Sequence, residues 1–180
     1  MTSDARERRL QALLLDHQAA VREYVNGAMA LPETAWLVPR AEGKWTPAQE
    51  TRHLVLTFDA FTRDLSGERR MGLRGTAWRR LLWRAVGLTQ ILWRRRIPVA
   101  VRAPREARPE WDETPRDVLL AELRERAARF DALLAESWRH DPRRRLRHPF
   151  FGGLSLDQTI RLSSVHTRHH AAFLMRSTFS

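Results

Sequence analysis

The 180-residue sequence contains no cysteine, a single tyrosine and a single lysine, Lys44, and it lacks any long uninterrupted apolar stretch. Without thiols it has no disulfide framework, no thiolate nucleophile and no cysteine-ligated zinc or iron–sulfur site. Histidine and carboxylate side chains are therefore the strong metal ligands left to it. Because the N-terminal residues lack the apolar core of a secretory signal, we expect a cytoplasmic protein.

Glycine and proline are also sparse, with 8 and 9 residues, and neither a low-complexity tract nor a repeat of fixed period is visible. Hydrophobic residues make up 43% of the chain, which is typical of a globular protein. The length fits one domain, so we expect residues 1–180 to form a single unit. The formal net charge of +11 comes almost wholly from arginine and favours an anionic substrate or surface over a cationic one.

Four segments have the three- and four-residue apolar spacing of amphipathic helices, at about residues 4–29, 47–66, 115–138 and 156–176. Two of them start with a threonine N-cap followed by proline, and the last starts with a Ser-x-x-Gln capping box. Residues 141–153 are expected to form a loop, and no segment alternates with the period of two that a strand requires. The sequence therefore predicts an all-α fold, an antiparallel four-helix bundle.

A basic segment connects the second and third predicted helices, at residues 69–110, and its first part, residues 69–105, holds eleven arginines and no acid. Within it, residues 76–93 fit a basic amphipathic helix whose apolar side carries Trp78, Leu81, Leu82, Ala85, Leu88 and Leu92. We expect the tryptophans to cover the bundle or a homodimer interface, in preference to binding nucleic acid or a membrane.

Three of the seven histidines form a candidate site, His53 on the second helix and His166 with His170 on the last. Residues four apart on a helix share one face, so His166 and His170 can hold one ion together. Both fall on the inward stripe of the last helix, where an unsatisfied imidazole costs roughly 1–3 kcal/mol. His169 points towards the edge of that stripe. A third histidine would leave positions free for water or substrate, as in catalytic metal sites.

Two motifs resemble the DinB/YfiT-like four-helix-bundle family. Residues 43–54, GKWTPAQETRHL, are similar to its first motif, Trp-Ser/Thr-x-x-Glu/Gln-x-x-x-His-Leu, and residues 148–155 with 166–170 are similar to its second. The resemblance implies the same bundle fold and implies His53, His166 and His170 as ligands of a divalent ion. Many members carry glutamine where this chain has Phe173.

The resemblance also implies a metal-dependent enzyme, in which the ion activates water or a low-molecular-weight thiol, as a hydrolase or a thiol S-transferase. Three imidazoles suit zinc first, with nickel, iron, manganese or copper as alternatives. We expect a small-molecule substrate, either an anion or a thiol. The alternative is a non-catalytic, stress-associated binding module whose Arg/Trp segment docks an acidic partner, nucleic acid or a membrane.

Other residues near the motifs have structural explanations that we prefer. Glu50 is the candidate general base, although a glutamate at this position is more often on the helix surface. Trp45 is expected to pack as a hydrophobic staple and Gln49 to cap the helix. His17 lies on the apolar stripe of the first helix, where we expect a hydrogen-bonded core residue.

Overall fold

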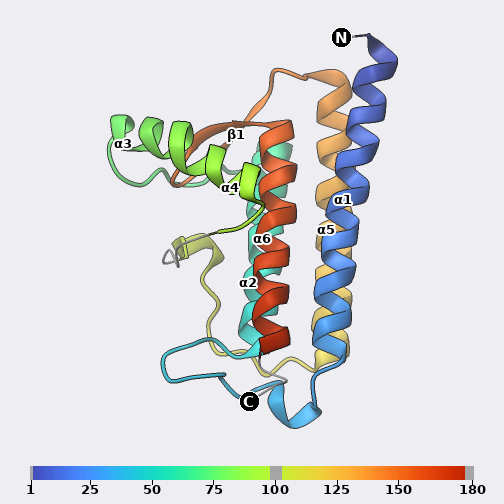
Figure 1. The fold of residues 1–180 in the computed structure, drawn as a ribbon, viewed down its shortest axis with the longest axis vertical. Coiled ribbons are helices and arrows are strands. Elements are labelled where there is room, and N and C mark those ends of the chain that lie inside the picture. Colours follow the sequence, from blue (N-terminus) through green and yellow to red (C-terminus); the bar gives the residue numbers. More distant parts are fainter. Residues whose placement is uncertain (1, 98–102, 177–180) are drawn as a thin grey trace.

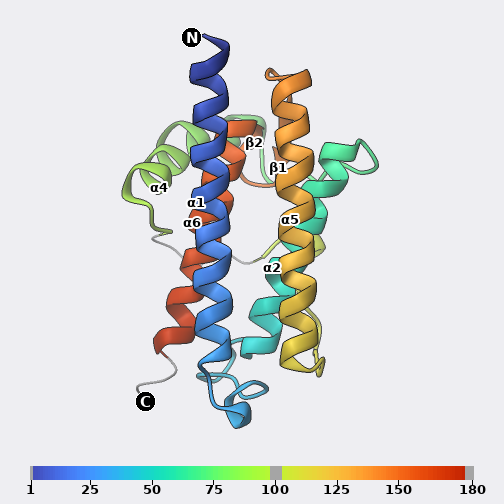
Figure 2. The ribbon, with the colours of Figure 1, turned by 90° about the vertical axis from the view of Figure 1, so that its right-hand side faces the viewer.

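The computed structural model describes residues 2–97 and 103–176. Four long helices form the bundle, α1 (Ser3–Met29), α2 (Pro47–Ser66), α5 (Arg116–His140) and α6 (Leu156–Arg176) (Figure 1). Helices α1 and α6 run in one direction and α2 and α5 in the other (Figures 1 and 2). The most extensive packing joins α1 to α6 and α2 to α5, so the closest neighbours are parallel. The predicted four-helix bundle is confirmed, but its two most closely packed helix pairs are parallel and not antiparallel as expected (Figure 1).

The core lies between these helices and is built from the apolar stripes that the sequence predicted. Leucine and aromatic side chains fill it, and each fully buried one stabilises the fold by roughly 1.5–3 kcal/mol. The largest that are wholly enclosed are Leu10, Tyr24, Leu54, Phe58, Leu119, Leu120, Leu123, Phe130 and Leu134. This rigid frame holds the α2 and α6 side chains described below.

The helix ends follow from local hydrogen bonds. Thr46 and Gln49 form a reciprocal capping box at α2, which ends at Gly67 with a φ of 81°, as the sequence predicted. Ser155 and Gln158 exchange the same pair of bonds at α6. Helix α5 differs, because it begins at Arg116 with no side-chain cap, one residue later than predicted. The expected cap, Thr114, instead accepts a hydrogen bond from Arg52.

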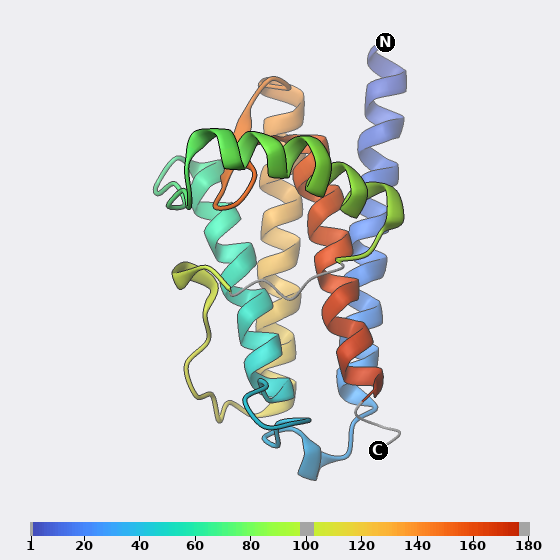
Figure 3. The same cartoon turned by 60° about the vertical axis from the view of Figure 1, so that its left-hand side comes forward.

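The basic segment contains one continuous helical stretch across the outer side of α2 and α6 (Figure 3). It consists of α3 (Ala77–Leu82), a π-helical part (Trp83–Leu88) and α4 (Thr89–Arg94), which confirms the helix predicted at 76–93. Its second half packs through Leu88, Ile91 and Leu92 against apolar residues of β2 and α6 and their surroundings. Short 3-10 helices lie at Glu33–Ala35 and Arg105–Ala107.

The predicted apolar side of this helix is partly wrong. Leu88 and Leu92 are buried, but Trp78, Leu81 and Leu82 are exposed. The tryptophans Trp78, Trp83 and Trp93 do not cover the bundle. The face that packs against the protein includes Arg80 and Arg84 and is therefore rotated from the one that the sequence indicated.

A short hairpin replaces the loop predicted at residues 141–153. Strands β1 (Arg145–His148) and β2 (Gly152–Ser155) pair in antiparallel register, with Leu146 opposite Leu154. These two leucines are fully buried. Each strand has only four residues and one fully buried leucine, so period-two alternation is not visible in the sequence. The expectation that the chain has no sheet was therefore wrong.

Candidate metal centre

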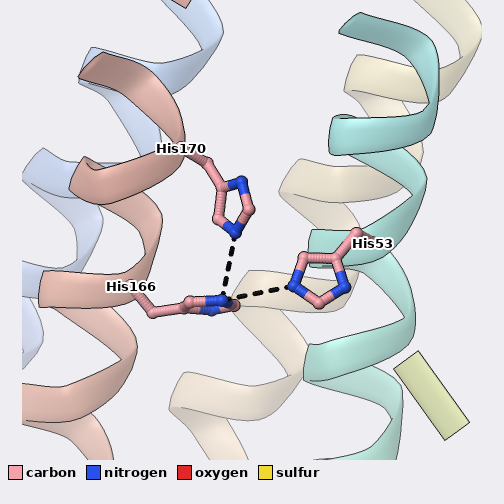
Figure 4. Close-up of side chains that lie close together, drawn as sticks. All are labelled: His53, His166 and His170. Atoms are coloured by element: carbon pink, nitrogen blue, oxygen red, sulfur yellow. Dashed lines mark hydrogen bonds between the residues drawn. The ribbon is translucent and has the colours of Figure 1, made fainter. Parts of the chain in front are cut away.

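Three imidazole rings from α2 and α6 point towards one another inside the bundle (Figure 4). The Nε2 atom of His166 lies 3.2 Å from Nε2 of His53 and 3.1 Å from Nε2 of His170. One nitrogen from each of the three residues lies within 4.8 Å of the others. The trio that the sequence singled out is thus brought together by two helices, although His53 and His166 are 113 residues apart in the sequence.

These separations match the ligand spacing of a small divalent ion. With metal–nitrogen bonds of about 2.0–2.1 Å, two tetrahedral ligands lie about 3.3 Å apart. The two distances at His166 fall close to that value. His53 and His170 are buried, whereas His166 is half-buried.

The outer nitrogen of two rings has a defined partner. Nδ1 of His53 donates a hydrogen bond to the carbonyl oxygen of Ala107, which can only accept. Its Nε2 therefore carries the lone pair and faces the site. Nδ1 of His170 is hydrogen-bonded to the Glu50 carboxyl group. Partners of this kind fix the tautomer and the orientation of metal-ligating imidazoles.

Burial keeps the three rings neutral, which is the state that binds metal. It lowers the pKa of His53, although the bond to Ala107 opposes the change. It also lowers the pKa of His166 and His170 well below the usual value, and the neighbouring histidines add to this effect. The cluster is therefore a set of lone-pair donors at neutral pH.

Glu50 is buried, so the preferred expectation of a solvent-facing glutamate was wrong. Its position three residues before His53 places it on the same side of α2, which is the signal that could have indicated its burial. Burial raises the pKa of Glu50 to about 7, against the effect of His53 and Arg40. A cation bound at Nε2 of His170 would favour the ionised form of the Glu50 carboxyl group, because unlike charges attract.

Aromatic and basic side chains border the trio. The half-buried Trp45 ring lies 5.0 Å from the His53 ring, so it packs on a site residue. His169 lies outside the trio, with its ring 4.4 Å from that of Phe173. The guanidinium carbon of Arg40 lies 3.9 Å from the centre of the Phe173 ring. Phe173 thus supports a cation beside the site.

The remaining histidines lie elsewhere. His17 is fully buried and its Nδ1 lies 2.7 Å from an Asp131 carboxylate oxygen, which confirms the predicted hydrogen-bonded core residue. His140 is in the last turn of α5. His148 belongs to β1 and accepts a hydrogen bond from the Phe150 amide.

Sequence reasoning missed two contributors to the site, the Ala107 carbonyl and Arg40. A backbone carbonyl carries no side-chain signal, and Ala107 lies within the long connection between α2 and α5, whose path the sequence does not specify. Arg40 is one of many arginines and precedes the first motif by several residues. Neither position could be singled out without the fold.

The comparisons with known proteins agree with this architecture. The chain is similar in structure to YfiT from Bacillus subtilis, described as a probable metal-dependent hydrolase with an unusual four-helix bundle topology. The two are 17% identical, the likeness covers 99% of this chain and 88% of YfiT, and the TM-score is 0.56. No curated protein matches the chain in sequence. The family model of the DinB superfamily matches residues 13–174, and the chain therefore belongs to the DinB superfamily.

Proposed function

We propose that the chain is a metal-dependent enzyme that holds a divalent ion through His53, His166 and His170. The observation that carries the proposal is the convergence of three neutral imidazoles, two of them buried and one half-buried, on one point. Zinc fits three nitrogen ligands best, with nickel, iron, manganese or copper as alternatives. Three protein ligands leave at least one position free, as in catalytic sites.

When bound, such an ion lowers the pKa of a coordinated water or low-molecular-weight thiol and makes it nucleophilic. The reaction would then be hydrolysis or thiol S-transfer, and the description of YfiT as a probable metal-dependent hydrolase supports the first form. The chain's own residues orient the ligands: Ala107 holds His53, and Glu50 holds His170. Because Glu50 is already bonded to His170, we assign it a positioning role in place of the general base.

The charges around the site favour an anionic small molecule. Arg40 lies against Phe173, close enough to influence both Glu50 and His170. None of the ion pairs formed within residues 2–97 and 103–176 uses its guanidinium. A cation held in this way can bind a carboxylate or phosphate group of the substrate.

The direct test is elemental analysis of protein purified without a histidine tag. We expect about one divalent ion per chain, and a loss of bound metal in His53→Ala, His166→Ala and His170→Ala. His140→Ala is the matched control, because this exposed histidine is in the last turn of α5, outside the trio. If the three site variants retain metal as the control does, the proposed site is wrong.

Thermal unfolding gives a second measurement of the same site. Metal at about one hundred times its Kd should stabilise the folded state by about 2.7 kcal/mol. For a chain of this length that corresponds to a rise in Tm of about 5–10 °C, which a chelator should reverse. His166→Ala should show neither the rise nor the reversal.

A further inference from the structure

The outward side of the α3–α4 helix is an apolar surface with no partner in the described chain. Four large side chains follow this side at spacings of four, four and seven residues: Trp78, Leu82, Val86 and Trp93, with exposed fractions of 65%, 54%, 50% and 78%. Leu81 and Trp83 flank them, also more than half exposed. Apolar patches of this kind on a soluble protein mark an interaction surface. We call these six residues the outer face.

Two arginines of the same helix, Arg80 and Arg84, point the other way. Arg80 donates hydrogen bonds to the backbone carbonyls of Arg74 and Gly75, and Arg84 donates one to that of Gly153. Both side chains are half-buried against the protein. Their positive charges are used to fasten the helix, and the outer face is left apolar.

Free positive charge surrounds the outer face. Arg79, Arg94 and Arg145 are exposed, and no ion pair within the described residues uses them. A hollow of about 600 Å³ adjoins the face at Trp93 and is lined by three arginines and one acid, Asp157. Residues 69–105 hold no acid at all. The surroundings of the face are therefore basic.

We propose that the outer face docks this protein onto an anionic lipid surface. Exposed tryptophans beside aliphatic side chains match the interfacial region of a bilayer, and the surrounding arginines match anionic headgroups. A second copy of the chain would bring the same basic segment against this one, and like charges would repel. Nucleic acid would use the arginines but would leave Leu82 and Val86 without apolar contacts.

The proposed contact is peripheral, because no helix in residues 2–97 or 103–176 has the length and hydropathy to cross a membrane. It uses no residue of the metal centre. The His166→Ala variant is therefore expected to bind vesicles as the unaltered protein does, and failure of one proposal leaves the other standing.

The experiment is co-sedimentation of the full chain with phosphatidylcholine vesicles that contain or lack phosphatidylglycerol. We expect binding to the anionic vesicles, a blue shift of tryptophan fluorescence, and steep weakening by salt. Replacing Trp78, Leu82 and Trp93 by serine should weaken binding at least about tenfold. The matched control replaces Leu15, Trp111 and Val118, which are similarly exposed outside the outer face.

A second pair of variants separates the contribution of the arginines to vesicle binding from that of the apolar side chains. Arg79, Arg94 and Arg145 changed to glutamine should also weaken binding at least about tenfold. Arg22, Arg124 and Arg129 changed to glutamine should leave it unchanged, since these arginines are exposed on α1 and α5. Circular dichroism verifies that each variant is folded.

Three outcomes would overturn the proposal. The first is absence of binding to the anionic vesicles. The second is a dimer in sedimentation analysis that the serine variant converts to a monomer, which would make the outer face a contact between copies. The third is salt-sensitive binding to duplex DNA, without lipid binding, that the glutamine variant abolishes.

Discussion

The carboxyl group of Glu50 on α2 hydrogen-bonds to Nδ1 of His170 on α6, so one helix orients a proposed metal ligand of the other. Both side chains are buried, with exposed fractions of 6%. An acid in this position holds the ring and makes its Nε2 a better donor to a cation. The capping box at Thr46 fixes where α2 begins, four residues before Glu50, and so sets the position of Glu50 along the helix.

We predict that Glu50→Ala weakens metal binding by about 10–100-fold, because His170 loses its partner. Glu50→Gln should have a smaller effect in the same direction, since the amide oxygen still accepts the Nδ1–H bond but carries no charge. Competition with a chromophoric chelator measures the affinity. Glu136→Gln, an exposed change on α5, is the control. Equal affinities in all four proteins would contradict the positioning role.

A second buried pair, His17 with Asp131, should affect stability without affecting metal. The pair joins α1 to α5, and the rings of Phe58 and Phe130 each form a T-shaped contact with the imidazole. Asp131→Ala removes the partner of a fully buried nitrogen, so the free energy of unfolding should fall by roughly 1–3 kcal/mol. The free energy of unfolding of Asp131→Asn should fall less, because the asparagine amide oxygen still accepts the hydrogen bond from His17.

Urea denaturation measures that difference, and the metal content of the folded variants provides the contrast. Glu136→Ala on the exposed side of α5 is expected to change stability by less than about 0.5 kcal/mol. If Asp131→Ala were as stable as this control, the buried hydrogen bond would contribute nothing. If it also lost metal, His17 and Asp131 would belong to the metal centre, contrary to our assignment.

Much of the helical frame was predictable because its signals are local. The apolar period defined the four long helices, and the cap residues at Thr46 and Ser155 defined two of their starts. The spacing of His166 and His170 placed both rings on one face. His53 could be joined to them only through the resemblance, since spacing says nothing about which helices are neighbours.

The rest depends on contacts between distant segments. The long connection from α2 to α5 makes parallel helices the closest neighbours, and no local pattern encodes that choice. The orientation of the α3–α4 helix was misjudged, because Arg80 and Arg84 find carbonyl acceptors on the protein and so turn inward. The β1–β2 hairpin was missed because Leu146 and Leu154 are the only fully buried side chains of two very short strands.

The free energy of unfolding should fall in acid, in part because His148 has a lowered pKa in the folded chain. Its ring stacks on Phe151 with centroids 4.6 Å apart, and burial lowers its pKa from 6.5 to about 3. The unfolded chain takes up this proton below about pH 6.5, whereas the folded chain does not. The contribution to the free energy of unfolding is therefore complete above pH 6.5 and is lost as the pH falls towards 3.

The slope should reach at most about 1.4 kcal/mol per pH unit for this residue. His148→Asn keeps an acceptor for the Phe150 amide and removes the titration, so its stability should fall less steeply between pH 6 and pH 4. Denaturation in the presence of a chelator, with His140→Asn as the control, makes the comparison. Parallel profiles for His148→Asn and the unaltered protein would show that His148 titrates alike in the folded and unfolded chain.

Arg40 provides the last prediction, which concerns the substrate of the proposed enzyme. Because its guanidinium lies over Phe173 beside the trio, it should strengthen the binding of an anion at the site. Inorganic phosphate, titrated calorimetrically into the zinc-loaded protein, should bind about fivefold to tenfold more weakly to Arg40→Ala. Lys44→Ala is the control, because this exposed cation lies on the same connection before α2.

Phe173→Leu tests the cation–π contact between the Arg40 guanidinium and the Phe173 ring. Cation–π contacts contribute about 0.5–1 kcal/mol at exposed sites, so phosphate affinity should fall by about twofold to fivefold, less than in Arg40→Ala. Arg40→Lys keeps the positive charge but lacks the planar guanidinium group. Its phosphate affinity should lie between those of Arg40→Ala and Phe173→Leu. If Arg40→Ala and Lys44→Ala weakened phosphate binding equally, the effect would come from general positive charge, and Arg40 would have no specific place in recognising an anionic substrate.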